Sequence, residues 1–346
     1  MHRHLRFQKV GRRAKVGAAV ILALLLVACA HPGIAKQPAA VTPKGPPVAT
    51  HSEVETVVQP GPPSARQQRT TTVACPAGST TLSGGAEAYL ADGKAPNPSL
   101  RLVATLPLAS PSALRWNSIV GTGGVDQSDS RVSAVAVCGS GVSDGRPTVV
   151  VTNAPGPTAA ASDALATATC PAGTVLVGGG AAVSLTNGQP GPPQYFFTGS
   201  FPSSRNGAPA GTGPVPNSWT AIGALGGMPM TNGRIQAVAV CAPGASASVN
   251  VVVNTSSGPT TPESAHEVTA TCPGHSVLVG GGVYTGPAEL ERPLQGLHLR
   301  GNFPSAPTGL ALTNGGSANS WSVIANSGGV IALGARTSAF ALCSAD

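Results

Sequence analysis

Three stretches of the chain alternate apolar residues with small or polar ones at a period of two. Each opens on an arginine and ends on a cysteine, and they cover residues 131–138, 234–241 and 336–343. This alternation is typical of β-strands, in which successive side chains point to opposite faces of a sheet. The residues that follow each tryptophan show a similar pattern, and no window combines helical periodicity with capping residues. The sequence therefore predicts an all-β fold with short strands and long loops rich in Gly, Ser and Pro.

The same series of landmarks occurs three times along the chain. A Cys-Pro pair leads into an apolar segment and a run of glycines, followed by a proline, a tryptophan and a second cysteine. The proline always lies 32 residues after the first cysteine (107−75, 202−170, 304−272), and the second cysteine lies 22 residues after the tryptophan (138−116, 241−219, 343−321). Only the spacing from proline to tryptophan differs, at 9 residues in the first copy (116−107) and 17 in the others (219−202, 321−304). We infer three homologous β repeats at 54–143, 148–246 and 250–346.

The repeats leave two arrangements open. Each could form its own sandwich-like unit, or the three could form a single three-fold β-prism-like body. Six of the seven cysteines lie in the repeats, two in each. Many pairings are possible, but repetition favours one bond inside each repeat. The expected disulfides are Cys75–Cys138, Cys170–Cys241 and Cys272–Cys343.

Each repeat carries one tryptophan and one glycine run. We interpret the tryptophan as the large residue at the centre of the core, and keep as an alternative an exposed ring that stacks on a ligand. The three candidate ligand contacts are Trp116, Trp219 and Trp321. No helix signal follows the glycine runs and no Lys-Ser/Thr pair lies downstream, so a phosphate-binding loop is disfavoured. The runs are better explained by close backbone approach or by β-bulges.

The charge of the chain is concentrated at its N-terminus. The formal net charge is +7, yet six of the 20 basic residues lie in the first 15 positions, and the other 14 (20−6) nearly balance 13 acidic residues. The repeats therefore lack the basic surface expected of a nucleic-acid-binding protein. With 41% hydrophobic and 10% charged residues, the composition also argues against a disordered chain.

The basic N-terminus precedes an apolar stretch from Val16 to Ala28, which is too short for a transmembrane helix and typical of an export signal. It ends in Leu26-Val27-Ala28-Cys29, which resembles the lipobox of bacterial lipoproteins. The resemblance implies that a signal peptide at 1–28 is removed and that Cys29 is lipidated. The proline-rich residues 29–53 would then form a tether between the membrane and the folded repeats.

No catalytic constellation emerges from the residue pattern. The histidines of the repeats are His266, His275 and His298, whose spacing matches no short metal-ligand motif. Acidic residues do not recur at equivalent positions, so a paired-carboxylate site would have to be confined to one repeat. We therefore expect no metal, no cofactor and no enzymatic activity.

The repeat pattern of Cys-Pro-x-Gly, Gly run, Asn-Ser-Trp and Ala-Val-Ala-Val-Cys resembles a module of exported bacterial proteins. The Cys-Pro-x-Gly turns are also similar, more distantly, to those of vitelline membrane outer layer proteins, which implies a three-fold β-prism. The leading hypothesis is a non-enzymatic, lipid-anchored protein on the extracytoplasmic face of a bacterial membrane. It would have a structural role in the envelope or bind a cell-wall glycan, an extracellular glycan or a protein. The alternatives, in order, are a lectin-like module that uses loops beside the tryptophans, and a secreted hydrolase.

Overall fold

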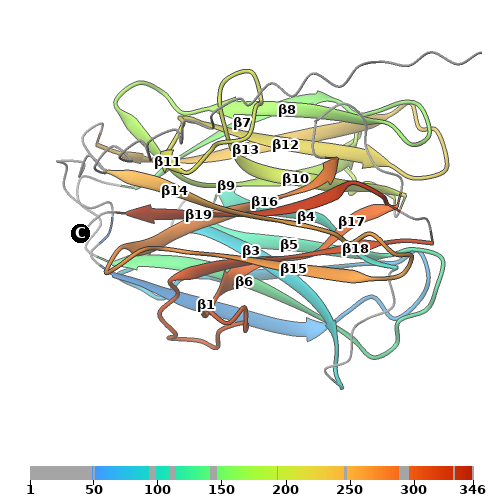
Figure 1. Ribbon diagram of the computed structural model, residues 1–346, viewed down its shortest axis with the longest axis horizontal. Coiled ribbons are helices and arrows are strands. Elements are labelled where there is room, and N and C mark those ends of the chain that lie inside the picture. Colours follow the sequence, from blue (N-terminus) through green and yellow to red (C-terminus); the bar gives the residue numbers. More distant parts are fainter. Residues whose placement is uncertain are drawn as a thin grey trace, which may run out of the picture. The chain divides into compact units, whose positions relative to one another are not determined.

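The computed structural model describes residue 49 and residues 51–92, 99–109, 114–140, 146–192, 194–244, 248–287, 296–329 and 332–344. Within these ranges every regular element is a β-strand, and there are nineteen of them (Figure 1). Over the same ranges, no helix has the length and apolar character needed to cross a membrane. The all-β class predicted from the alternating pattern is confirmed.

The strands form three sheets, which we call sheets A, B and C. Their neighbouring strands pair antiparallel. Sheet A has the order β1-β6-β3-β17-β18-β15. Its strands are β1 (His51–Pro60), β6 (Ser130–Ser140), β3 (Thr80–Leu90), β17 (Leu297–Ser305), β18 (Ser320–Ser327) and β15 (Ala265–Thr271).

Sheet B has the order β2-β5-β4-β9-β13-β7, and sheet C has the order β11-β14-β19-β16-β10-β12-β8. The strands of sheet B are β2 (Gln68–Ala74), β5 (Leu114–Thr122), β4 (Leu100–Ala109), β9 (Thr174–Leu185), β13 (Gly233–Pro243) and β7 (Thr148–Pro155). Those of sheet C are β11 (Gly213–Pro214), β14 (Val249–Ser257), β19 (Ala335–Ser344), β16 (Val277–Pro287), β10 (Tyr195–Ser203), β12 (Ser218–Leu225) and β8 (Asp163–Thr169).

Each sheet is shared between two repeats. Sheet A joins three strands of the first repeat to three of the third, and sheet B joins the first repeat to the second. Sheet C joins the second repeat to the third. The repeats are therefore not separate sandwich-like units. They form one body in which three shared sheets join the repeats in a closed ring, as the β-prism-like alternative predicts. At each junction a glycine-run strand pairs with the proline strand of another repeat, as β3 does with β17.

The expected disulfides are present and they also connect sheets. Their Cα–Cα distances are 5.5, 5.7 and 5.6 Å for Cys75–Cys138, Cys170–Cys241 and Cys272–Cys343. In each bond the first cysteine lies at or just beyond the end of a strand of one sheet, and the second lies within a strand of another. Together the three bonds link sheet A to B, B to C and C to A.

The glycine runs accommodate the tryptophans. The side chains of Trp116, Trp219 and Trp321 have an exposed fraction of 0%. Gly84, Gly179 and Gly281 are equivalent, and a Cβ atom on them would lie 2.5, 2.3 and 2.1 Å from the indole ring of the same repeat. Only glycine leaves room for the ring, so each glycine run is a packing requirement of the neighbouring tryptophan. A β-bulge lies just before each of these three glycines, as expected from the sequence.

Each indole also has a fixed hydrogen-bond partner. The Nε1 atoms of the three rings donate to Thr105 Oγ1, Ser200 Oγ and Asn302 Oδ1 at 2.8, 3.0 and 2.7 Å. These acceptors occupy equivalent positions. Each lies two residues before the proline that follows the first cysteine of its repeat by 32 residues. A buried indole N–H needs such an acceptor, because leaving it unpaired would cost free energy on folding.

The repeats depart from symmetry where their glycine-run strands meet. Ser83, Gly178 and Gly280 are equivalent in the three repeats, and Ser83 is fully buried. A Cβ atom on Gly178 would lie 2.6 Å from the Ser83 Cβ, and one on Gly280 would lie 2.9 Å from it. The space between the repeats therefore holds one side chain, and the first repeat supplies it.

Candidate functional site

A cavity of about 910 Å³ lies on sheet A, where the strands of the first repeat meet those of the third. We call it the sheet A cavity. Its floor comes from six strands, and its rim from the connection between β17 and β18. The polar lining residues are Thr56, Glu87, Tyr89, Ser133, Glu267, Arg300, Thr313 and Asn314. The apolar ones include Val58, Val135, Phe303, Leu310, Leu312 and Ile324.

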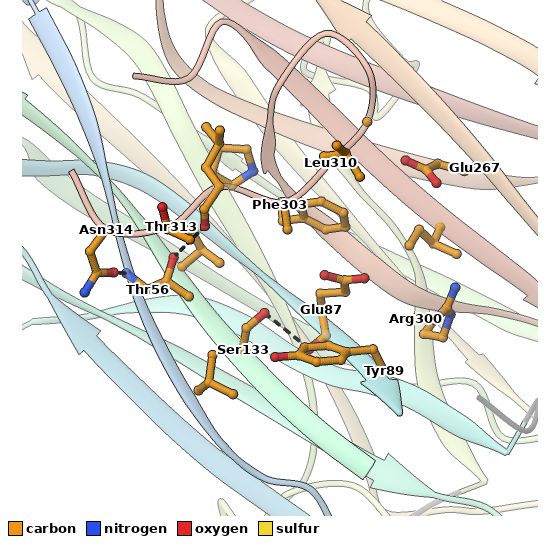
Figure 2. Close-up of a pocket in the computed structure, with 17 residues that line it drawn as sticks. Thr56, Glu87, Tyr89, Ser133, Glu267, Arg300, Phe303, Leu310, Thr313 and Asn314 are labelled. Carbon is orange, nitrogen blue, oxygen red and sulfur yellow. Dashed lines mark hydrogen bonds between the residues drawn. The ribbon is translucent and has the colours of Figure 1, made fainter. Parts of the chain in front are cut away.

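The rim is held in place by the first strand of the first repeat. The Thr56 amide donates to Asn314 Oδ1 at 2.6 Å, and its hydroxyl donates to the Leu312 carbonyl at 3.4 Å (Figure 2). The Val54 amide donates to the Gly316 carbonyl at 2.9 Å. The β17–β18 connection of the third repeat therefore crosses onto β1. It belongs to the segment that is eight residues longer in the second and third repeats than in the first (17−9).

Four ionisable side chains line this cavity, and the three that carry charge at neutral pH when ionised come from three different strands. The Glu87 carboxylate lies in its middle, below the Phe303 ring, with Arg300 and Glu267 to one side (Figure 2). The Arg300 side chain is 8% exposed, and its guanidinium Nη1 donates to the Ala88 carbonyl at 3.2 Å. Among the described residues, its Nε has no hydrogen-bond partner. A buried donor without a partner disfavours folding, because its lost hydrogen bond to water is not replaced.

Burial dominates the electrostatics of these groups. It raises the pKa of Glu87 to about 7, while the positive charge of Arg300 opposes the rise and the negative charge of Glu267 adds to it. Burial also raises the pKa of Glu267 and lowers the pKa of the Arg300 guanidinium. The Glu87 carboxyl therefore keeps its proton to a higher pH than an ordinary glutamate does.

The three charged side chains of the sheet A cavity have no charged counterparts at the equivalent positions of the other two sheets. With offsets of 95 (170−75) and 102 (272−170) between the repeats, Glu87 corresponds to Ala182 and Tyr284. The pairing confirms this equivalence, because Glu87, Ala182 and Tyr284 pair with residues that are themselves equivalent across the repeats.

The other two charged residues are also replaced by uncharged ones. Arg300 corresponds to Val103 and Thr198, and Glu267 corresponds to Thr70 and Leu165. Sheets B and C therefore form the same strand junctions without these charges, so the fold does not require them.

Sheet C has a smaller cavity at the related position. Its volume is about 420 Å³, and its lining includes Tyr284 and Phe340. The rings of both residues pack against Phe201, with centroid distances of 5.7 and 5.8 Å. The aromatic side chains thus occupy space that the sheet A cavity leaves open around Glu87.

The tryptophans proposed as ligand contacts do not line this cavity. Trp116, Trp219 and Trp321 have no exposed surface, so none offers a ring face on which a sugar could stack. The alternative that these rings stack on a ligand is therefore wrong. The three tryptophans are core residues, as the preferred interpretation of the sequence had it.

The three histidines have separate environments. His266 Nε2 lies 2.6 Å from Ser256 Oγ, and the His298 ring packs edge-on against Phe196 at a centroid distance of 6.1 Å. Over the described ranges, no group of three His, Cys, Asp or Glu side chains could hold a metal ion.

Several expectations lie outside the described residues. The signal peptide at 1–28, the lipidated Cys29 and most of the tether at 29–53 are among them. The first strand of the first repeat begins at His51 rather than at 54.

The cavity residues were not singled out from the sequence. The expectation that a carboxylate site would be confined to one repeat is wrong, because Glu87 lies in the first repeat and Glu267 in the third. When the repeats are aligned on their cysteines, Glu87, Glu267 and Arg300 are each the only charged residue at their position. No family model matches the chain, and no curated protein matches it.

Proposed function

We propose that this chain is a non-enzymatic, lipid-anchored protein on the extracytoplasmic face of a bacterial membrane, and that its three-repeat body binds an extracellular partner in the sheet A cavity. The observation that carries the binding role is the restriction of Glu87, Arg300 and Glu267 to one of three equivalent junctions. Arg300 is buried and Glu87 is partly buried, whereas Glu267 is exposed. Burying charged groups such as the first two disfavours folding. Their presence in only one sheet therefore supports a role in binding.

The lipobox supports the location. An acyl chain on Cys29 together with further acylation would anchor the mature protein stably, since one chain alone gives only weak, reversible membrane binding. Three disulfides also suit an oxidising extracytoplasmic compartment.

The test uses the mature protein purified from membranes in detergent. Mass spectrometry should find a diacylglyceryl group on an N-terminal Cys29, and an unmodified terminus would contradict the anchor. Co-sedimentation with isolated cell envelopes should then be compared between the wild type, a Glu87→Gln/Arg300→Met variant and the control Glu53→Gln. Glu53 lies in the same sheet, but its side chain is 47% exposed and outside the cavity. Loss of binding in the double variant alone supports the proposal, and equal binding by all three refutes it.

A hydrolase is the second candidate, and one specific observation favours it. A carboxylic acid with a pKa near 7 can act as a general acid, and Glu267 supplies a second carboxylate in the same cavity. Hydrolysis of envelope polysaccharide by the wild type, abolished in Glu87→Gln while the protein stays folded, would establish this function in place of the binding role.

A further inference from the structure

The first strand of each repeat lies at one side of a sheet, and in two of the three repeats its outer edge is covered. Val54 on β1, Val149 on β7 and Val251 on β14 are equivalent, at the repeat offsets of 95 (149−54) and 102 (251−149). The Val54 amide donates to the Gly316 carbonyl at 2.9 Å. Val251 pairs with Gly213 of β11. In sheets A and C, a connection from another repeat therefore lies along the outer edge.

This cover extends to the next residues that face outward. The Thr56 amide donates to Asn314 Oδ1 at 2.6 Å, and the amide of the equivalent Val253 donates to Thr212 Oγ1 at 3.1 Å. Both acceptors belong to the connection between the proline and the tryptophan of a repeat, which is eight residues shorter in the first repeat than in the other two (17−9).

The shorter connection of the first repeat cannot supply the same cover to β7. Ala109 of β4 pairs with Leu114 of β5, which leaves four residues, 110–113, between the two strands. The path from Ala109 to Leu114 is at most about 18 Å long. In sheet B, β7 lies three strands from β4, a distance of about 14 Å, so a connection that reached β7 and returned would need about 28 Å.

The outer edge of β7 is consequently free of neighbours in the part of the chain that the structure describes. There β7 pairs with β13 alone, and no hydrogen bond joins the amide of Val149 or Val151 to another element. The side chains of Val54 and Val251 are fully buried, whereas Val149 is partly exposed and Val151 is 48% exposed. Such an edge presents unpaired amides and carbonyls to which a further strand can add.

No charge protects this edge from pairing with another chain. The other outer strands longer than two residues are β1, β2, β8 and β15, and each carries at least one charged residue: Glu53, Glu55, Arg69, Asp163 and Glu267. Charges on an outer strand oppose unwanted pairing. β7 has none, and it holds three consecutive valines, which favour the strand conformation. Among the described strands, β7 is thus the one outer strand with neither cover nor charge.

The strand is also complementary to itself. Pro147 and Pro155 lie four residues on either side of Val151 (151−147, 155−151), and neither has an amide hydrogen to donate. An antiparallel pair of two copies centred on Val151 would set Val149 opposite Asn153 and each proline opposite the other. The outward-facing residues would then exchange about six hydrogen bonds. Pairing would end at a proline on both sides in both copies.

We propose that β7 is a self-association edge, at which two copies of this chain pair antiparallel about Val151 and join their B sheets into one continuous sheet. A second copy is the partner that the symmetric spacing of the prolines and the lack of charge fit. Such a two-fold contact closes at two copies. One strand pair is a small interface, so the dissociation constant should be about 1–100 μM. This inference goes beyond the proposed function and does not depend on the sheet A cavity.

The first test is sedimentation equilibrium of the mature lipidated protein in a density-matched detergent, at about 1–200 μM. The protein mass should rise with concentration to twice that of one chain. Val151→Lys would set two ammonium groups opposite each other, so the dissociation constant should increase at least about tenfold. Val125→Lys is the matched control, because Val125 is also 48% exposed but lies in the connection between β5 and β6. It should associate like the wild type.

The second test is amide hydrogen exchange of the wild type, which needs no variant. Exchange at Val149 and Val151 should slow at least about tenfold from the lowest to the highest concentration. Exchange at Val54 and Val251 should not depend on concentration, because their edges are already covered.

Three results would overturn the proposal. The first is a mass of one chain at every concentration. The second is a dimer that Val151→Lys leaves intact, or that both lysine variants weaken equally. The third is slow exchange at Val149 and Val151 in the monomer, which would show that another segment of the chain already occupies the edge of β7.

Discussion

Replacing Gly281 with alanine tests the central packing relation of the repeats. Gly281 is the middle glycine of its run, and its Cβ would lie 2.1 Å from the Trp321 ring and 2.5 Å from the Phe340 carbonyl oxygen. Neither neighbour can move freely. The indole is fully buried and donates to Asn302, and Phe340 lies within the β19 ladder. The clash can be relieved only by displacing the core or the strand.

The expected magnitude follows from two opposing effects. Overpacking a well-packed core costs about 1–3 kcal/mol, and this site is at the upper end because both neighbours are fixed. Gly281 does not have a positive φ, so alanine can adopt its backbone conformation. Alanine also lowers the conformational entropy of the unfolded chain, which offsets about 0.5 kcal/mol of the lost stability. We expect the free energy of unfolding to fall by about 2–3 kcal/mol.

Urea unfolding followed by tryptophan fluorescence under oxidising conditions measures this change. Gly124→Ala is the matched control, because a Cβ there would meet nothing within 4 Å and Gly124 has no positive φ. It should be neutral or slightly stabilising. If both variants unfold with the same free energy while all disulfides are formed, the account of the glycine runs is wrong.

Three further predictions follow from the same structure. Replacing both Cys170 and Cys241 with alanine should lower the free energy of unfolding by about 4 kcal/mol, because the bond closes a loop of 71 residues; a loss below about 1 kcal/mol would contradict this. Trp321→Phe should cost about 2–4 kcal/mol in chemical unfolding, since it removes core volume and leaves Asn302 Oδ1 without its donor. Because the pKa of Glu87 is raised from 4.5 to about 7 on folding, the wild type should lose stability as pH rises through that interval. Glu87→Gln should not show this loss, and it should exceed the wild type by at most about 3 kcal/mol near pH 8; parallel pH profiles would refute the raised pKa.

Local patterns predicted the strands and the disulfides. The alternation before Cys138, Cys241 and Cys343 lies within β6, β13 and β19, and equal spacing singled out the cysteine pairs. Period-two burial and loop closure depend on residues close in sequence or repeated at fixed offsets. These features can therefore be inferred without coordinates.

The sharing of sheets between repeats could not be predicted in the same way. The glycine-run strand has an exposed edge after folding of its own repeat, and nothing in its sequence specifies which proline strand pairs with it. The pairing of Glu87 with Gly301 spans most of the chain. The sheet A cavity depends on this pairing and on the hydrogen bond from the Thr56 amide to Asn314 Oδ1. It therefore could not be predicted from the sequence pattern either.

The sheet A cavity is the central claim, and the ionisation of Glu87 tests it most directly. Carbon-13 NMR of the side-chain carboxyl, assigned by its loss in Glu87→Gln, gives the midpoint of the titration in the folded protein. We predict a pKa of about 7. A midpoint close to the ordinary value of 4.5 would contradict the burial of Glu87 in the sheet A cavity.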